Sequence, residues 1–140
     1  MAKILYIDDN AHGLTARRVL LEGMGHNVIV ARNGRDGLEI FQNEKLDMVI
    51  VDYRMPHMNG DVVVREVKRT HPKLPVILLS GFVDTMELEE KVKEADCILK
   101  KDSREVEELV SAVNRLLRKS MKKPSASLAA KKAARRQAKS

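Results

Sequence analysis

The sequence predicts an α/β domain in which five strands form a parallel sheet with helices on its two faces. Short apolar runs alternate with longer stretches of helical period, and five such pairs can be counted along the chain. Several of the runs are almost entirely apolar, which is typical of strands covered on both faces. A chain of 140 residues is also long enough to bury a core of this kind without disulfides.

The predicted strands are short runs of mainly aliphatic residues. In chain order they are Ile4–Ile7, Val28–Ala31, Met48–Val51, Val76–Leu79 and Ile98–Leu99. The second, third and fourth runs have the most continuous apolar character. We therefore expect these three strands in the centre of the sheet.

Apolar residues at helical spacing occupy the stretches between these runs. The first three helices are predicted from Leu14, Arg18, Leu21 and Met24, from Leu38, Ile40 and Phe41, and from Val62, Val63 and Val67. A fourth helix is expected over Thr85–Glu94. The clearest pattern predicts a fifth helix from about Ser103 to Arg118, with acidic residues in the first turn, where the helix dipole favours them.

The composition indicates a soluble, cytoplasmic protein. Cys97 is the single cysteine, so an intramolecular disulfide is excluded and a reducing compartment is favoured. The N-terminus meets Asp8 and Asp9 after only a short apolar stretch, which is too short and too acidic for a secretory signal. No apolar run approaches the roughly 18 residues that a membrane-spanning helix needs, so no membrane contact is expected.

The net charge of +6 is concentrated at the C-terminus. Residues 121–140 hold seven basic residues and no acid, whereas residues 1–120 hold 19 basic and 20 acidic residues. We therefore expect one domain over 1–120 and a basic tail over 121–140 that is disordered when free. The tail either binds nucleic acid or another polyanion, with a log-log salt slope of about −6 on duplex DNA for seven contacts, or is a solvated, solubilising extension.

Three carboxylates stand where predicted strands end. Asp8 and Asp9 close the first strand, and Asp52 closes the third. In a flavodoxin-like (βα)5 doubly wound sheet of order 2-1-3-4-5 these two strands are neighbours, and ligands gather at the carboxyl ends of the strands. Like charges this close repel one another, so the cluster needs a hard divalent cation such as Mg²⁺.

Each acid by itself has an ordinary structural interpretation, because aspartates commonly cap helices and solvate loops. Two further residues favour a functional site. Ser80 ends the fourth strand and Lys101 follows the fifth, so a hydroxyl and an ammonium group reach the same edge as the carboxylates. Together they are suited to binding an anion such as a phosphoryl group.

Four segments resemble the response-regulator receiver family of two-component systems, and stand-alone receivers similar to chemotaxis regulators in particular. They are Ile4–Asn10, Val51–Gly60, Leu79–Gly81 and Leu99–Lys101, within a similarity that covers about residues 1–119. The Asp-x-x-Met-Pro-x-Met-Asn-Gly sequence that begins at Asp52 is a strong signal by itself.

The resemblance implies that Asp52 accepts a phosphoryl group from a sensor histidine kinase, a phosphotransfer protein or a small phosphodonor. Mg²⁺ would be held by Asp9, Asp52 and the backbone carbonyl of Arg54, with Asp8 acting directly or through water. Ser80 and Lys101 would grip the phosphoryl group. Lys101 is preferred to Lys100, because it fits the family's functional lysine better and alternation places the two on opposite sides of the strand.

Such a protein is not a conventional enzyme, since it catalyses only its own phosphorylation and dephosphorylation. It would act on an unknown downstream protein through altered contacts, because no output domain fits in the last 20 residues. Many receivers have an aromatic residue in the fifth strand that moves on activation, but Ile98 stands at that position. Two alternatives are a phosphatase, which Arg54 opposes because an acid is needed there, and a degenerate receiver that only binds partners.

Overall fold

The computed structural model describes residues 1–81 and 85–122 of the chain. Its five strands form one parallel sheet of order β2-β1-β3-β4-β5. The strands are β1 (Lys3–Ile7), β2 (Asn27–Ala31), β3 (Met48–Asp52), β4 (Val76–Ser80) and β5 (Cys97–Lys100). The predicted flavodoxin-like order is therefore confirmed. The expectation that the second strand is central is wrong, because β2 lies at an edge, where residues such as Ile29 and Val30 remain half-buried.

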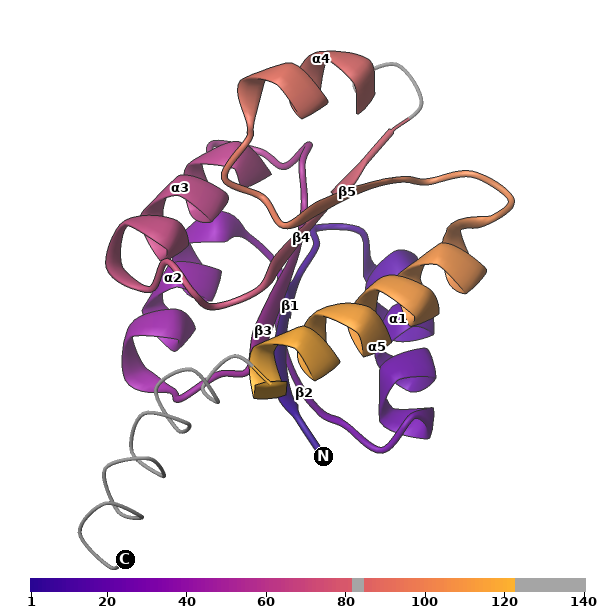
Figure 1. The fold of residues 1–140 in the computed structure, drawn as a ribbon. Helices are drawn as coiled ribbons and strands as arrows, with labels where there is room; N and C mark the ends of the chain where they lie inside the picture. The colour runs from indigo at the N-terminus through magenta and orange to yellow at the C-terminus, as the bar shows by residue number, and fades with distance from the viewer. Residues whose placement is uncertain (82–84, 123–140) are drawn as a thin grey trace, which may run out of the picture.

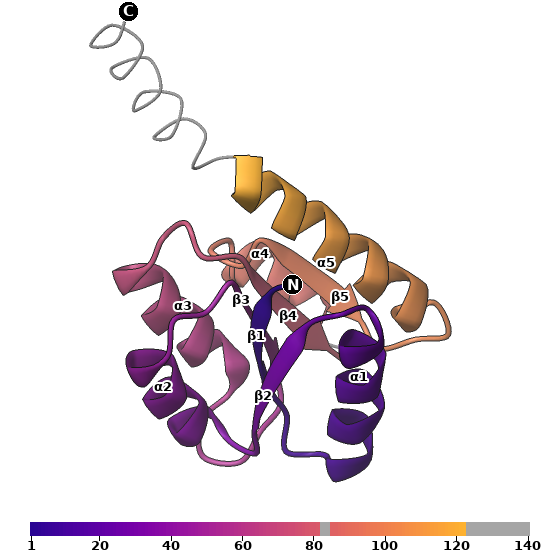
Figure 2. The ribbon, with the colours of Figure 1, turned by 90° about the horizontal axis from the view of Figure 1, so that it is seen from below.

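Helices cover both faces of the sheet, as Figures 1 and 2 show. They are α1 (Ala11–Gly23), α2 (Gly34–Asn43), α3 (Gly60–Thr70), α4 (Thr85–Lys91) and α5 (Glu105–Lys122). The view in Figure 2 separates α2 and α3 on one face from α1 and α5 on the other. Among the described residues, no helix combines the length and apolar character that crossing a bilayer requires.

The last two helices differ from their predicted limits. The fourth ends at Lys91 rather than Glu94, because the chain turns there to enter β5: the N–H of Ala95 bonds to the Val92 carbonyl, and Asp96 pairs with Val76 through its N–H and its carboxylate. The fifth begins at Glu105 and continues to Lys122. The predicted tail over 121–140 lies outside the described residues from position 123 onwards.

Alternation along the strands divides the core into two clusters, one on each face of the sheet. In β1, Ile4 and Tyr6 pack on the side of α1 and α5, whereas Leu5 and Ile7 pack on the side of α2 and α3. All four side chains are fully buried. Both faces of the sheet are thus covered, so polar side chains reach solvent only where the strands end.

Candidate functional site

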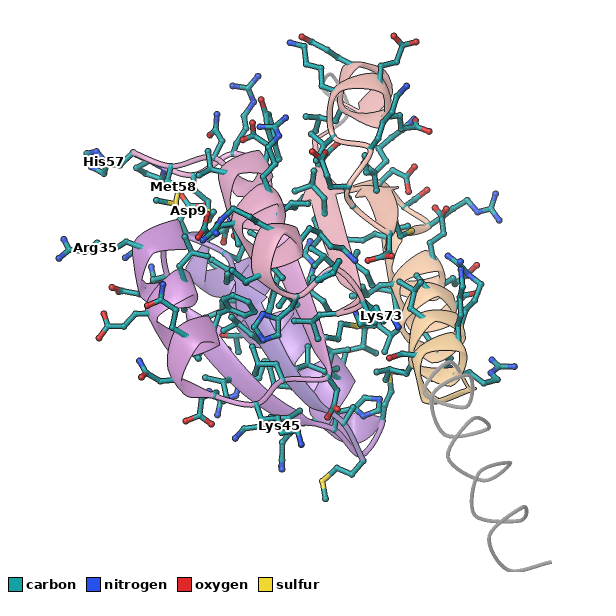
Figure 3. All side chains as sticks on the ribbon, turned by 60° about the vertical axis from the view of Figure 1, so that its left-hand side comes forward. Asp9, Arg35, Lys45, His57, Met58 and Lys73 are labelled. Atoms are coloured by element: carbon teal, nitrogen blue, oxygen red, sulfur yellow. The ribbon has the colours of Figure 1, made fainter. Side chains whose placement is uncertain are left out.

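The three aspartates that end β1 and β3 lie together. Asp8, Asp9 and Asp52 each offer a carboxylate oxygen, and these oxygens all lie within 4.8 Å of one another. Asp8 and Asp52 are buried, and Asp9 is half-buried. Adjacency of β1 and β3, with Ile7 opposite Val51, produces this convergence. Figure 3 shows Asp9 at one end of the sheet beside the labelled Met58, with Lys45 at the opposite end.

The turn after Asp52 needs a glycine at its far end. A Cβ at Gly60 would lie 2.3 Å from the Asp52 carbonyl oxygen, a distance that no side chain tolerates. The Gly60 N–H also donates to the Tyr53 carbonyl at 2.7 Å. Between them, His57 adopts a left-handed backbone with φ 67°, which is uncommon for residues other than glycine. The first turn of α3 is thereby pressed against the end of β3.

Lys101 reaches into the acidic cluster. Its Nζ lies 2.7 Å from Asp52 Oδ1 and 4.0 Å from Asp8 Oδ2. The backbone N–H of Lys101 donates to the Ser80 carbonyl at 2.8 Å, which fixes the chain where it leaves β5. Lys100, the last residue of β5, is paired in register with Ser80. The structure thus places the ammonium group of Lys101 against the Asp52 carboxylate.

The electrostatic environment of Asp52 makes its charged form more costly than that of a free carboxylate. Burial raises the pKa of Asp52 above its ordinary value, and the nearby charges of Asp8 and Asp9 raise it further. The Lys101 ammonium opposes this by hydrogen bonding and by charge, but the net pKa remains raised. Asp52 is therefore a desolvated carboxylate with incomplete charge compensation, and an added cation would relieve the imbalance.

The other two predicted site residues lie at the same edge. Ser80 is fully buried at the end of β4, next to β3, and its Oγ donates to the Gly81 carbonyl at 3.1 Å. Arg54 is exposed, and its guanidinium lies 6.0 Å from the centre of the Tyr53 ring. The roles predicted for the Ser80 hydroxyl and the Arg54 carbonyl remain predictions.

A set of polar contacts behind Asp8 was not predicted from the sequence. The Tyr6 hydroxyl donates to Asp8 Oδ2 at 2.7 Å, and Arg17 Nη1 donates to the same oxygen at 3.2 Å and to the Tyr6 hydroxyl at 2.8 Å. Arg17 Nη2 pairs with Glu105 at the start of α5. Burial is the largest cause of a raised pKa at Tyr6, so this hydroxyl stays protonated as a donor.

Helical spacing alone did not identify the inward-facing arginine. The pattern grouped Arg18 with Leu14 and Leu21, but Arg18 is exposed and pairs with Glu22 on the surface of α1. Arg17 also fits a helical spacing from Leu14, and it is this residue that turns inward. A tyrosine in an otherwise aliphatic buried strand was the available signal, since a buried hydroxyl needs a polar partner.

The donor set fits a magnesium ion. Mg²⁺ prefers oxygen ligands and is commonly held by one or two carboxylates while it keeps several waters. The cluster supplies carboxylate oxygens in the required proximity, and Asp52 is buried with its charge incompletely balanced. Within the described residues, these aspartates are the one group of three or more histidine, cysteine and acidic side chains close enough together to hold a metal.

Fold and site together define a doubly wound α/β protein with an acidic, lysine-containing site at the carboxyl ends of its strands. Residues 4–114 match the model of the response regulator receiver domain. The chain therefore belongs to the receiver domain family of two-component response regulators. Receiver domains are phosphoacceptor signalling domains, and phosphorylation and Mg²⁺ binding are typical of them.

Similar proteins include a curated regulator and two solved structures. The transcriptional regulatory protein ZraR of Escherichia coli is 35% identical over 79 residues, which cover 56% of this chain and 18% of ZraR. A receiver domain protein from Clostridium thermocellum is 34% identical with a TM-score of 0.80, covering 86% of this chain and 98% of that one. Response regulator TrrA from Thermotoga maritima, solved with Mg²⁺-BeF, is 26% identical with a TM-score of 0.75, covering 83% and 99%. The match thus covers less than a fifth of the length of the first curated relatives.

Proposed function

We propose that the chain accepts a phosphoryl group on Asp52 from a sensor histidine kinase or a phosphotransfer protein, in a Mg²⁺-dependent reaction in the cytoplasm. The observation that carries the proposal is the Asp52 carboxylate, buried beside two further aspartates and 2.7 Å from the Lys101 ammonium. The TrrA complex with Mg²⁺-BeF supports it, because that structure belongs to a protein of the same fold and family.

The chemical step is a nucleophilic displacement at phosphorus. An Asp52 oxygen forms a bond to phosphorus while the bond to the imidazole nitrogen of the donor breaks, and the electron pair leaves with that nitrogen. Lys101, whose Nζ lies 2.7 Å from Asp52 Oδ1, would neutralise a phosphoryl oxygen. Ser80 Oγ would exchange its bond to the Gly81 carbonyl for one to a second phosphoryl oxygen.

The metal would be held by Asp9, Asp52 and the Arg54 carbonyl, with Asp8 binding directly or through water. When bound, Mg²⁺ neutralises phosphoryl oxygens as charge is transferred. The carboxylates would orient it, since they stand at the ends of β1 and β3, two strands whose register is fixed by the sheet. Lys101, already beside Asp52, adds the remaining positive charge.

The output would be an altered surface for an unidentified downstream protein. A phosphorylated side chain gains about 1.5 to 2 negative charges and three strong acceptors, which draw nearby donors inward. Ser80 is the donor at the end of β4 that we expect to move. Ile98 of β5 packs against the hydrophobic core on the side of α2 and α3. An aliphatic side chain therefore stands where many receivers have the aromatic residue that moves on activation.

The test is incubation with acetyl phosphate and MgCl₂, followed by intact mass measurement. Wild type should gain the mass of one phosphoryl group, and Asp52→Asn should gain none. Asp61→Asn is a matched control, because Asp61 is an aspartate on α3 that pairs with Arg65 and does not belong to the cluster of three aspartates. Labelling of Asp52→Asn equal to that of wild type, or no labelling of wild type, would contradict the proposal; the second result favours a degenerate receiver.

A further inference from the structure

Asp8 already has a buried cation against it. Its Oδ2 accepts hydrogen bonds from the Tyr6 hydroxyl at 2.7 Å and from Arg17 Nη1 at 3.2 Å. Its Oδ1 accepts the N–H of Asn10 at 2.9 Å. Asp8 is fully buried, and the Arg17 side chain is only 12% exposed. Solvent therefore screens this pair poorly, and an ion that approaches Asp8 meets the charge of the guanidinium.

The first turn of α1 accommodates this guanidinium. A Cβ at Gly13 would lie 2.6 Å from Arg17 Nη1 and 3.3 Å from Asp8 Oδ2, so the absent side chain leaves the room that the guanidinium occupies. Arg17 Nε is buried and finds no hydrogen-bond acceptor among the described residues. An arginine held in this way incurs a desolvation cost, which favours a role for its charge over a role in packing.

Glu105 faces the same guanidinium from another element. Its carboxylate pairs with Arg17 Nη2, and both side chains are mostly buried. Glu105 lies in the first turn of α5, whereas Asp8 follows β1, so Arg17 bridges the acidic site and the start of α5. One cation thus stands between two carboxylates, of which only Asp8 belongs to the candidate metal site.

We propose that Arg17 is a positioning residue that competes with the metal ion for Asp8, and that Glu105 sets the strength of this competition by neutralising Arg17. The inference rests on the proposed function, since it assumes that Mg²⁺ binds at the aspartates. An arginine side chain keeps its charge at any working pH, so Arg17 competes with the metal ion throughout the pH range in which the protein is studied. Removing Arg17 should strengthen metal binding, and removing the charge of Glu105 should weaken it.

Linkage gives the competition a second consequence. If the Arg17–Glu105 pair favours metal binding, metal binding must favour that pair by the same factor. With a cation bound at the aspartates, Arg17 would hold Asp8 less strongly and would pair more strongly with Glu105, between α1 and the first turn of α5. Metal occupancy would then change the contact between α1 and the start of α5.

The test is titration with MgCl₂ followed by tyrosine fluorescence. The chain contains two tyrosines and no tryptophan. Tyr6 touches Asp8, and Tyr53 follows Asp52, so both report on the site. We expect Arg17→Met to lower the dissociation constant for Mg²⁺ about tenfold and Glu105→Gln to raise it about threefold, in line with partly screened charges a few ångströms apart. Arg17→Lys should restore much of the wild-type value.

Two further variants separate this mechanism from a structural effect. In the double variant Arg17→Met with Glu105→Gln, the Glu105 substitution should lose most of its effect, because its route to the metal is gone. Arg18→Met removes one charge from the adjacent position, where the side chain pairs with Glu22 at the surface, and should leave the affinity unchanged. A structural role would shift both single variants in the same direction.

The outcomes distinguish the inference from the proposed function. Absence of Mg²⁺ binding by wild type contradicts the proposed function itself. Binding by wild type with weakened binding in Arg17→Met, or an equal change in Arg18→Met, contradicts the role of Arg17 and leaves the proposed function intact. Thermal unfolding of each variant shows whether it is folded. If Arg17→Met is not folded, Glu105→Gln provides the test, because unchanged or stronger Mg²⁺ binding in that variant contradicts the competition.

Discussion

At the scale of single residues, the site depends on a carboxylate that folding makes costly. Asp52 is 6% exposed, and burial together with two neighbouring aspartates outweighs the attraction of Lys101. A strained charge of this kind is typical of a site whose counter-ion arrives with the ligand. The residue types indicate which chemistry is possible at the site, whereas burial and neighbouring charges determine how costly the Asp52 charge is.

Neutralising Asp52 should stabilise the metal-free protein. A carboxyl with a raised pKa binds more protons in the folded state than in the unfolded state, so the free energy of unfolding falls as pH rises from the ordinary value through the raised one. Asp52→Asn removes this loss, and we expect a gain of about 1 kcal/mol at pH 7.5 that shrinks towards pH 4. Urea unfolding in EDTA at both pH values measures it. A variant less stable than wild type at pH 7.5 would contradict the prediction.

Lys101 and Lys100 offer a matched pair for testing the catalytic ammonium. Lys101→Met should slow labelling by a small phosphodonor about 100-fold, as expected when one preorganised donor to a transferred group is lost. Lys100→Met should label at a rate close to that of wild type, because Lys101 is the lysine placed 2.7 Å from Asp52. Time courses of intact mass compare them. Equal slowing in both variants would remove the distinction.

At the scale of elements, the junction of β3 with α3 determines where Asp52 points. Gly60 starts α3 and packs against the Asp52 carbonyl, while the N–H of Gly60 bonds to the Tyr53 carbonyl. The periodicity of α3 predicted the helix, but nothing in that period indicates this close approach. The glycine acts through a backbone contact that only the packed structure reveals.

Gly60→Ala should destabilise the fold and disturb the site. Its Cβ would lie 2.3 Å from a backbone oxygen, which must move, so we expect a loss of about 1 to 3 kcal/mol, typical of overpacking, together with weaker labelling of Asp52. Gly23→Ala is the control, since a Cβ there meets no described atom within 4 Å. It should be neutral or slightly stabilising in urea unfolding. Equal effects of the two substitutions would refute the steric argument.

At the scale of the whole molecule, the site is held together only by the folded sheet. Its residues come from the ends of four strands, β1, β3, β4 and β5, and from the segments that follow them. Ligand binding at such a site is coupled to global stability, because the unfolded chain has no equivalent arrangement. The tail beyond Lys122 contributes none of these residues.

Mg²⁺ should therefore stabilise wild type against unfolding. The expected gain is about 1.4 kcal/mol when the free ion exceeds its dissociation constant tenfold. The gain should be much smaller in Asp9→Asn, which removes one of the clustered carboxylates. Thermal unfolding in MgCl₂ and in EDTA measures the difference. An equal gain in both proteins would show that the ion acts elsewhere.

Truncation after Lys122 should leave both the fold and the labelling of Asp52 unchanged, since the site lies within residues 1–120. Thermal unfolding and mass measurement test this. The same variant decides between the two interpretations of the tail, because it removes six of its seven basic residues. Loss of salt-dependent polyanion binding on truncation supports a binding tail, and unchanged affinity supports a solvated extension.

The sequence by itself determined the five strand–helix pairs and the family, because strand periodicity, apolar continuity and the motif around Asp52 are local properties. It also identified Asp8, Asp9, Ser80 and Lys101 as residues at strand ends. Their roles as metal ligands and phosphoryl contacts remain predictions.

Only the tertiary structure decided which helical residue faces the site, where β2 lies and which charges share Asp8. Arg17 and Arg18 both fit the helical period, and the choice between them depends on Tyr6 of β1 and Glu105 of α5, which are far away along the chain. Long-range pairing of this kind leaves no local signal, since its energy arises only when burial brings the partners together.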